Sequence, residues 1–184
     1  MAIKLFFSLA AFVLTPTILF SQAGILDGDF DGDGRVTTAI LSGDSKATCL
    51  AIQPNGYIVA AGSAITSGAG ASTNYGIVRY RLDGSLDNTF SLNGKADFGI
   101  ATAANDDAEA VAILPDGKIL VAGNSATATG TAFSALLLNP GGTSFDVSFG
   151  TNGKLLLETV DFIFESMVLQ PDGKIVAAGY SYNG

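Results

Sequence analysis

The clearest chemical signature is a run of aspartates near the N-terminus, DGDFDGDG at residues 27–34. Asp29, Asp31 and Asp33 alternate with other residues before a glycine, and calcium sites in loops often begin this way because Ca²⁺ takes six to eight oxygens. The twelfth position counted from Asp29 is Ile40, where an EF-hand carries a bidentate glutamate. The spacing therefore leaves two interpretations open, a structural calcium site at these three aspartates or a solvated acidic turn. We expect no other cofactor.

A second acidic group, Asp106, Asp107 and Glu109, has counterparts in Asp161 and Glu165 farther along the chain. Paired carboxylates at a suitable separation hydrolyse glycosidic bonds. Recurrence at corresponding places favours a polar segment at the start of a strand instead. We therefore expect no catalytic residues.

The chain contains no histidine, which excludes a Ser-His-Asp triad, a Cys-His pair and histidine metal ligands. The segment Gly43-Asp44-Ser45 resembles the nucleophile region of some esterases, but without a histidine it is predicted to be a polar loop. Cys49 is the single cysteine, so no internal disulfide can form. It aligns with Ala110 and Ser166, and this favours a small strand residue over a reactive thiol.

Three tyrosines, Tyr57, Tyr75 and Tyr80, could line a ligand surface, although aromatic packing between sheets is the more common role. The small-residue stretches 67–72 and 126–130 are predicted to be loops of variable length. No lysine follows either of them, so neither is a phosphate-binding loop.

These residues lie in a chain that repeats itself with a period of about 60 residues. The phenylalanines Phe30, Phe90 and Phe149 are separated by 60 and 59 positions, and each is followed by a glycine and a basic residue. A turn of the form Pro-x-Gly also recurs. The three copies of that turn are Gln53–Gly56, Leu114–Gly117 and Gln170–Gly173.

Each repeat is predicted to contain about four short β-strands and no helix. Apolar runs on both sides of the Pro-x-Gly turn indicate a hairpin, and each second run ends at a glycine that we expect to close the strand. The expected strands are 47–52, 57–61, 75–81 and 95–98, then 108–113, 118–122, 133–138 and 154–158, then 164–169 and 174–178. Four strands per repeat are typical of an all-β, β-propeller-like fold, here with roughly two and a half blades.

The chain resembles the delta-60 repeat family, secreted bacterial proteins with a predicted β-propeller fold. The resemblance rests on IQPNGYIVAAG, ILPDGKILVAG and LQPDGKIVAAG, together with VRYRLDGSLDNTF and SFDVSFGTNGKL. It implies the fold but no activity, because the family has no assigned catalytic residues to carry over. The second repeat departs from the pattern at Leu114 and at residues 136–139.

The N-terminus predicts export. Lys4 precedes an apolar run at residues 5–20, and Ser21-Gln22-Ala23 provides a small-x-small exit, which together indicate a signal peptide over residues 1–23. The remaining residues, 24–184, are predicted to form one repeat domain with units of approximately 25–84, 85–143 and 144–184. Without Lys4 the chain has 8 cations against 17 acids, which argues against nucleic acid or anionic lipid as partners.

Export and a repeat fold favour a secreted or cell-surface, non-catalytic module that binds or scaffolds an extracellular protein or polysaccharide. The alternative is an accessory propeller of an extracellular carbohydrate-active enzyme. Propellers typically close with four to eight blades, so we expect the array to continue in a longer protein, or several copies to assemble. Stable membrane insertion is not expected after cleavage.

Overall fold

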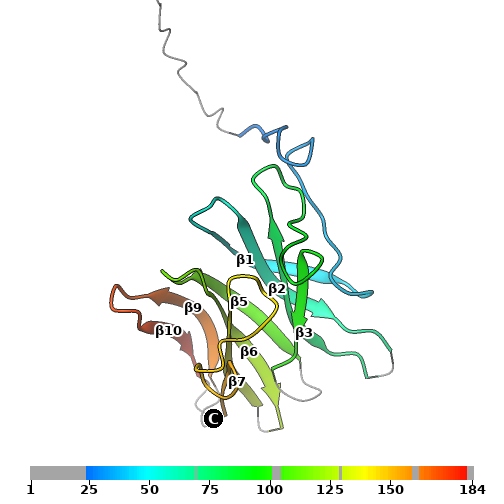
Figure 1. Cartoon of the computed structure of the whole chain (residues 1–184). Helices are drawn as coiled ribbons and strands as arrows, with labels where there is room; N and C mark the ends of the chain where they lie inside the picture. Colours follow the sequence, from blue (N-terminus) through cyan, green and yellow to red (C-terminus); the bar gives the residue numbers. More distant parts are fainter. Residues whose placement is uncertain (1–23, 69, 101–104, 129, 159–161, 182–184) are drawn as a thin grey trace, which may run out of the picture.

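A computed structural model describes residues 24–68, 70–100, 105–128, 130–158 and 162–181. The predicted signal peptide and Asp161 lie outside these residues. All regular structure in the described part is β-strand, arranged in three antiparallel sheets (Figure 1). The all-β, β-propeller-like fold expected from the sequence is therefore confirmed.

The first two sheets are four-stranded meanders, and the third is a hairpin. Within each sheet, strands that follow one another in the chain are paired side by side. The first sheet contains β1 (Ser45–Ile52), β2 (Ile58–Ile65), β3 (Thr73–Tyr80) and β4 (Lys95–Phe98). The second contains β5 (Asp106–Ile113), β6 (Ile119–Thr127), β7 (Gly130–Leu138) and β8 (Lys154–Leu157), and the hairpin contains β9 (Ile163–Leu169) and β10 (Ile175–Tyr180).

The turns form as the sequence predicts. In the Pro-x-Gly turn of each repeat the glycine has a positive φ, 86° at Gly56 and 84° at Gly117, a conformation that glycine adopts without steric cost. The glycine amide donates to the residue before the proline, with a distance of 2.8 Å from Gly56 N to Gln53 O. These contacts fix the register of β1 on β2 and of β5 on β6.

The expectation that Gly62, Gly123 and Gly179 end their strands is wrong. β2, β6 and β10 each continue past the glycine, because the residue lies opposite a β-bulge in the preceding strand. A Cβ at Gly62 would lie 1.9 Å from the carbonyl oxygen of Lys46, and one at Gly123 would lie 2.0 Å from that of Asp107. Glycine is required there by the close approach of the bulged backbone, not by strand termination.

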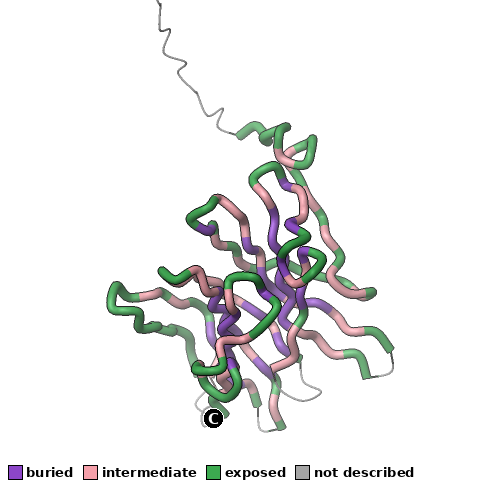
Figure 2. Tube along the Cα trace, viewed as in Figure 1, coloured by how far each residue is buried: buried purple, intermediate pink, exposed green. Residues whose placement is uncertain are grey.

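The core lies between the sheets. Val59 and Ile77 of the first sheet pack against Val121 and Leu136 of the second, and all four are fully buried. The opposite face of the second sheet packs against the hairpin through Phe133 and Phe164, whose ring centroids are 5.2 Å apart. Buried residues therefore follow the middle strands of the two larger sheets, and β10 is exposed along its length (Figure 2).

The sheets begin at a different point of the period from the predicted units. The first sheet spans residues 45–98, whereas the second predicted unit begins at residue 85. The phenylalanine turn and β4, which open that unit in the sequence, therefore belong to the first sheet. Residues 25–44 come before the first sheet and contain no regular strand.

Candidate functional site

The candidate site is the edge formed by the first strand of each sheet. β1 contacts β5, and β5 contacts β9, so the three strands are neighbours although they come from different repeats. Each has one bulge at the same place in its register, and the bulged residues are Thr48, Glu109 and Glu165. We refer to these three residues as the bulge triad. A bulge redirects a side chain at the edge of a sheet, which is why such positions often serve function.

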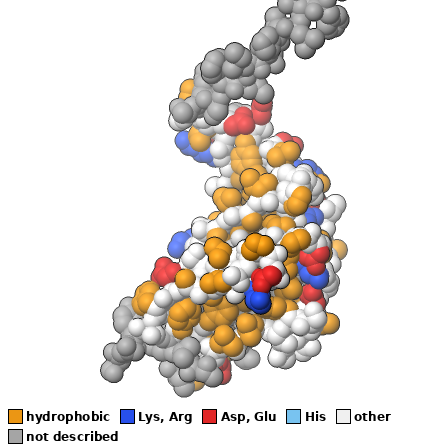
Figure 3. Space-filling model, turned by 90° about the vertical axis from the view of Figure 1, so that its left-hand side faces the viewer, with side chains coloured by type: hydrophobic (Ala, Val, Ile, Leu, Met, Phe, Trp, Pro, Cys, Tyr) orange, Lys and Arg blue, Asp and Glu red, His pale blue; other side chains and the backbone are white. Residues whose placement is uncertain are grey.

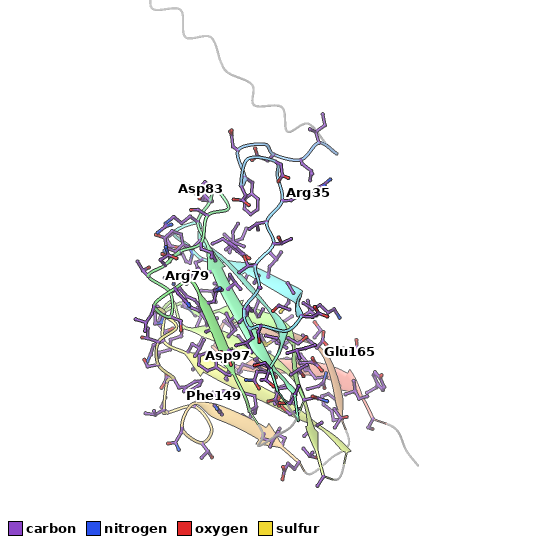
Figure 4. The ribbon with its side chains drawn as sticks, turned by 90° about the vertical axis from the view of Figure 1, so that its right-hand side faces the viewer. Arg35, Arg79, Asp83, Asp97, Phe149 and Glu165 are labelled. Carbon is purple, nitrogen blue, oxygen red and sulfur yellow. The ribbon has the colours of Figure 1, made fainter. Side chains whose placement is uncertain are left out.

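Charges converge on Glu109. Burial raises the pKa of its carboxyl above the ordinary value, Lys46 opposes the shift, and Asp107 and Glu165 add to it. Glu165 is exposed, as Figure 4 shows, and Glu109 is half-buried. The edge therefore presents a carboxylate pair from two repeats with one cation nearby, an arrangement suited to hydroxyl, amide or ammonium groups of a ligand.

The other acids of the predicted cluster have different places. Asp106 is fully buried, and its Oδ2 accepts a hydrogen bond of 2.8 Å from the backbone N–H of Ile100, so it holds the connection from β4 to β5. Asp107 is half-buried beside the bulge. Of the predicted acids that the structure describes, Glu109 and Glu165 are therefore the two brought together at the edge.

Two aspartates of the N-terminal run cap their own turn. Oδ1 of Asp27 accepts a bond of 3.0 Å from Asp29 N, and Oδ1 of Asp33 accepts one of 2.9 Å from Arg35 N. Elsewhere Asn93 makes the same bond to Lys95 N, at 3.1 Å. Within the described ranges, no three acidic, histidine or cysteine side chains are grouped so that they could hold a metal ion. Calcium at Asp29, Asp31 and Asp33 stays one of the two interpretations of the sequence, which a titration would test.

The Gly43–Ser45 segment is held by backbone and side-chain hydrogen bonds at the start of β1. The carbonyl of Asp44 accepts a bond of 2.9 Å from Ile65 N, and Oγ of Ser45 accepts one of 3.2 Å from Ile40 N.

Cys49 pairs with Ala61 in the β1–β2 ladder, and burial raises the pKa of its thiol to about 11. A thiol that stays protonated at neutral pH is a poor nucleophile.

The tyrosines lie in different surroundings. Tyr75 is fully buried, and its hydroxyl lies 2.7 Å from Oγ of Ser134 in the second sheet, so it packs between sheets. The hydroxyl of Tyr80 donates to Thr38 at 2.7 Å. Tyr57 lies against the guanidinium of Arg79, whose Cζ is 5.2 Å from the ring centroid.

Sequence reasoning missed the importance of Arg79. This side chain is 7% exposed, pairs with the fully buried Asp87, and donates 2.7 Å to the carbonyl of Pro140 in the second sheet's turn. Its Cζ also lies 4.9 Å from the ring centroid of Phe90. The sequence signal was an arginine between apolar residues, eight positions before an aspartate, but the contact of Arg79 with Pro140 forms only when the first two sheets pack together.

The phenylalanine turn, the Pro-x-Gly hairpin and the strands between them thus recur as one structural unit. Three segments match the DUF5122 β-propeller family. The family model, described as a domain of unknown function (DUF5122) beta-propeller, matches residues 53–90, 114–149 and 170–184. Comparison with curated proteins and with solved structures gave no match.

The DUF5122 match recurs with the period of the repeat, although its first two segments leave out β1, β4, β5 and β8. Its first two segments begin at the residue before the turn proline and end at Phe90 and Phe149, so they include the second and third strands of each four-stranded sheet. The propeller part of the expected resemblance is confirmed, whereas the delta-60 assignment itself stays a prediction. No helix in the described part of the chain could cross a membrane.

Proposed function

We propose that this chain is a secreted or cell-surface, non-catalytic module that binds or scaffolds an extracellular protein or polysaccharide through the edge that carries the bulge triad. The observation that carries the proposal is the alignment of Thr48, Glu109 and Glu165 on three neighbouring strands. Rigid sheets hold these side chains, and a binding site on rigid elements is more precise than one on loops.

The chemistry of the edge favours a polar ligand. Thr48 is exposed and bridges to the second sheet by donating from Oγ1 to the carbonyl of Ala108. Carboxylates accept hydrogen bonds from sugar hydroxyls and from lysine or arginine side chains. The net charge of −8 disfavours nucleic acid, in agreement with an extracellular polymer as the ligand.

Binding of the secreted protein to a panel of polysaccharides and extracellular proteins tests the proposal. The Glu109→Gln and Glu165→Gln variants keep the side-chain volume and remove the charge, so each should weaken binding at least about tenfold if the edge is the site. Asp116→Asn is the matched control, because Asp116 is an exposed carboxylate in a turn and not on the edge. Equal binding by all three variants would refute the edge as the contact surface.

One observation favours the alternative, an accessory part of a carbohydrate-active enzyme. Glu109 has a raised pKa beside a second carboxylate, Glu165, and this combination occurs in acid catalysts. Exchange of Glu109, Asp161 and Glu165 together for their amides separates the two functions. Loss of glycan turnover with retained glycan binding would establish the enzyme, whereas turnover that survives the triple exchange would remove it.

A further inference from the structure

Residues 27–40 occupy on the first sheet the place that residues 87–100 occupy on the second. Asp31 N donates 2.7 Å to Asp83 O, and Ser91, sixty positions later, donates 3.0 Å to Gly141 O. Asp83 and Gly141 are the residues that precede the turn glycines Gly84 and Gly142. The same contact between repeats is therefore made twice, once by the N-terminal segment and once by the turn before β4.

A second pair of equivalent contacts fixes the register of this segment. Lys95 Nζ donates 3.0 Å to the carbonyl of Ala39, and Lys154 Nζ donates 2.6 Å to the carbonyl of Gly99. The phenylalanine turn also has the same internal bond, 2.7 Å from Gly34 N to Phe30 O and 2.7 Å from Gly94 N to Phe90 O. Residues 35–38 are thereby equivalent to β4 and β8, the fourth strands of the two complete sheets.

The equivalent strands differ in one respect. β4 pairs with β3 from Tyr75↔Phe98 to Val78↔Lys95, and β8 pairs with β7 in the same way. Residues 35–38 form no strand, and no strand of the described ranges pairs with them. Residues 35–38 therefore occupy the position of the fourth strand of a sheet, but the third strand with which they would pair is not among the described residues.

The face of the first sheet beside this segment is also only partly covered. Ala60, Val78 and Tyr80 stand where Val121, Leu136 and Leu138 stand in the second sheet, and those three are fully buried against the first sheet. Here Val78 and Tyr80 are 5% and 7% exposed under the chain that precedes β1, Ala60 is half-buried, and a hollow of about 460 Å³ remains beside them. This face of the first sheet could therefore pack against one more sheet, in the way that the second sheet packs against the first.

We propose that this hollow is the seat of a further blade, and that the occupant is a three-stranded antiparallel sheet of the same repeat from the same polypeptide, whose third strand pairs with residues 35–38. The observation behind it is the continuity of the interface between the first two sheets. A second copy fits less well, because each of its four-stranded sheets has its own fourth strand and its hairpin β9–β10 offers only two strands. Residues 35–38 would then be the fourth strand of the blade whose first three strands the occupant supplies, and this pairing would close the propeller.

Photo-cross-linking identifies the occupant in the protein secreted by its natural source. A benzophenone amino acid replaces Thr37, an exposed residue equivalent to Asp97 of β4, and the control replaces Val147, which is 73% exposed in a turn. The proposal expects an intramolecular cross-link from position 37 to a peptide with the repeat's third-strand pattern, and none from position 147. A cross-link to another copy of the chain, to an unrelated peptide, or to nothing beyond the control would overturn it.

Hydrogen exchange tests the strand without any substitution. In the secreted protein the amides of residues 35–38 should exchange within about tenfold of those of β4, because both would be fourth strands paired on one edge. Exchange about a thousandfold faster than in β4 would show that nothing pairs with the segment. This outcome would refute the further blade and leave the proposed ligand edge unaffected, since the edge depends on β1, β5 and β9.

Discussion

Nη2 of Arg79 lies 2.7 Å from Oδ2 of Asp87, and both side chains are withdrawn from solvent. Because Arg79 also donates to the carbonyl of Pro140, the pair joins the first sheet to the turn of the second. In the second repeat Leu137 replaces the arginine, and Lys118 reaches Asp146 at 3.0 Å instead. These two repeats thus both neutralise this aspartate, but with a cation from a different place in the sheet.

The Asp87→Ala variant should lose about 3–5 kcal/mol of unfolding free energy, because it leaves the buried guanidinium without its counter-ion. Urea unfolding followed by circular dichroism measures the loss. The control Asp116→Asn breaks an exposed pair with Lys118 and should leave the unfolding free energy nearly unchanged. Equal losses in the two variants would show that the Arg79–Asp87 pair contributes no more than a surface contact.

Acid should destabilise the protein through the same residue. Burial alone would raise the pKa of Asp87, but hydrogen bonds from Thr89 and Arg79 outweigh it and hold the pKa below 3.8. A carboxyl with a lowered folded pKa stabilises the fold above its unfolded pKa and loses that contribution as pH falls through the folded value. Unfolding free energy should therefore decline below about pH 4, and less steeply in Asp87→Asn. Parallel pH profiles for the two proteins would contradict this assignment.

Gly62→Ala should destabilise the first sheet, by about 1–3 kcal/mol or more, since the new methyl would meet the carbonyl of Lys46 across the bulge. Thermal unfolding of the secreted protein gives the comparison. Gly28→Ala serves as the control, because no atom lies within 4 Å of its added methyl and its φ is not positive. If both variants melt with the wild type, the bulge relaxes without cost.

Cys49 should be alkylated slowly in the folded protein. A thiol pKa of about 11, against an ordinary 9.0, lowers the thiolate fraction at pH 8 on the order of 100-fold. Iodoacetamide labelling followed by mass spectrometry compares the native protein with protein in urea. Native labelling as fast as the denatured rate would mean that the thiol is reactive and would reopen a chemical role for Cys49.

The aspartate run is tested by calcium. Asp27 and Asp33 each bond to a backbone amide, so the turn is held without an ion, and we expect the melting temperature to be equal in calcium and in chelator. An ion that binds only the folded state must raise the melting temperature. A rise in calcium that Asp31→Asn abolishes would instead establish the predicted site.

Much of the fold could be predicted because its signals are local. A hairpin needs a turn of fixed chemistry between two apolar runs, and the Gln53–Gly56 turn and its two counterparts provide it within a few residues. The strand β4 was predicted at Lys95–Phe98, and the structure has the same bounds. The alignment of Cys49 with Ala110 and Ser166 was also correct, since each lies directly after the bulge of its strand.

The sequence by itself determined the period of the repeat, the strands within it and the turn residues, because these depend on neighbours a few positions apart. Only the tertiary structure decided where each sheet begins within the period, why Gly62 lies inside a strand, and which groups surround Arg79. A periodic sequence has the same pattern wherever the repeat unit is taken to begin. The hydrogen bonds between strands therefore determine which four strands form one sheet. Contacts such as Arg79 with Pro140, or Glu109 near Glu165, join different repeats, and they form only when the sheets pack side by side.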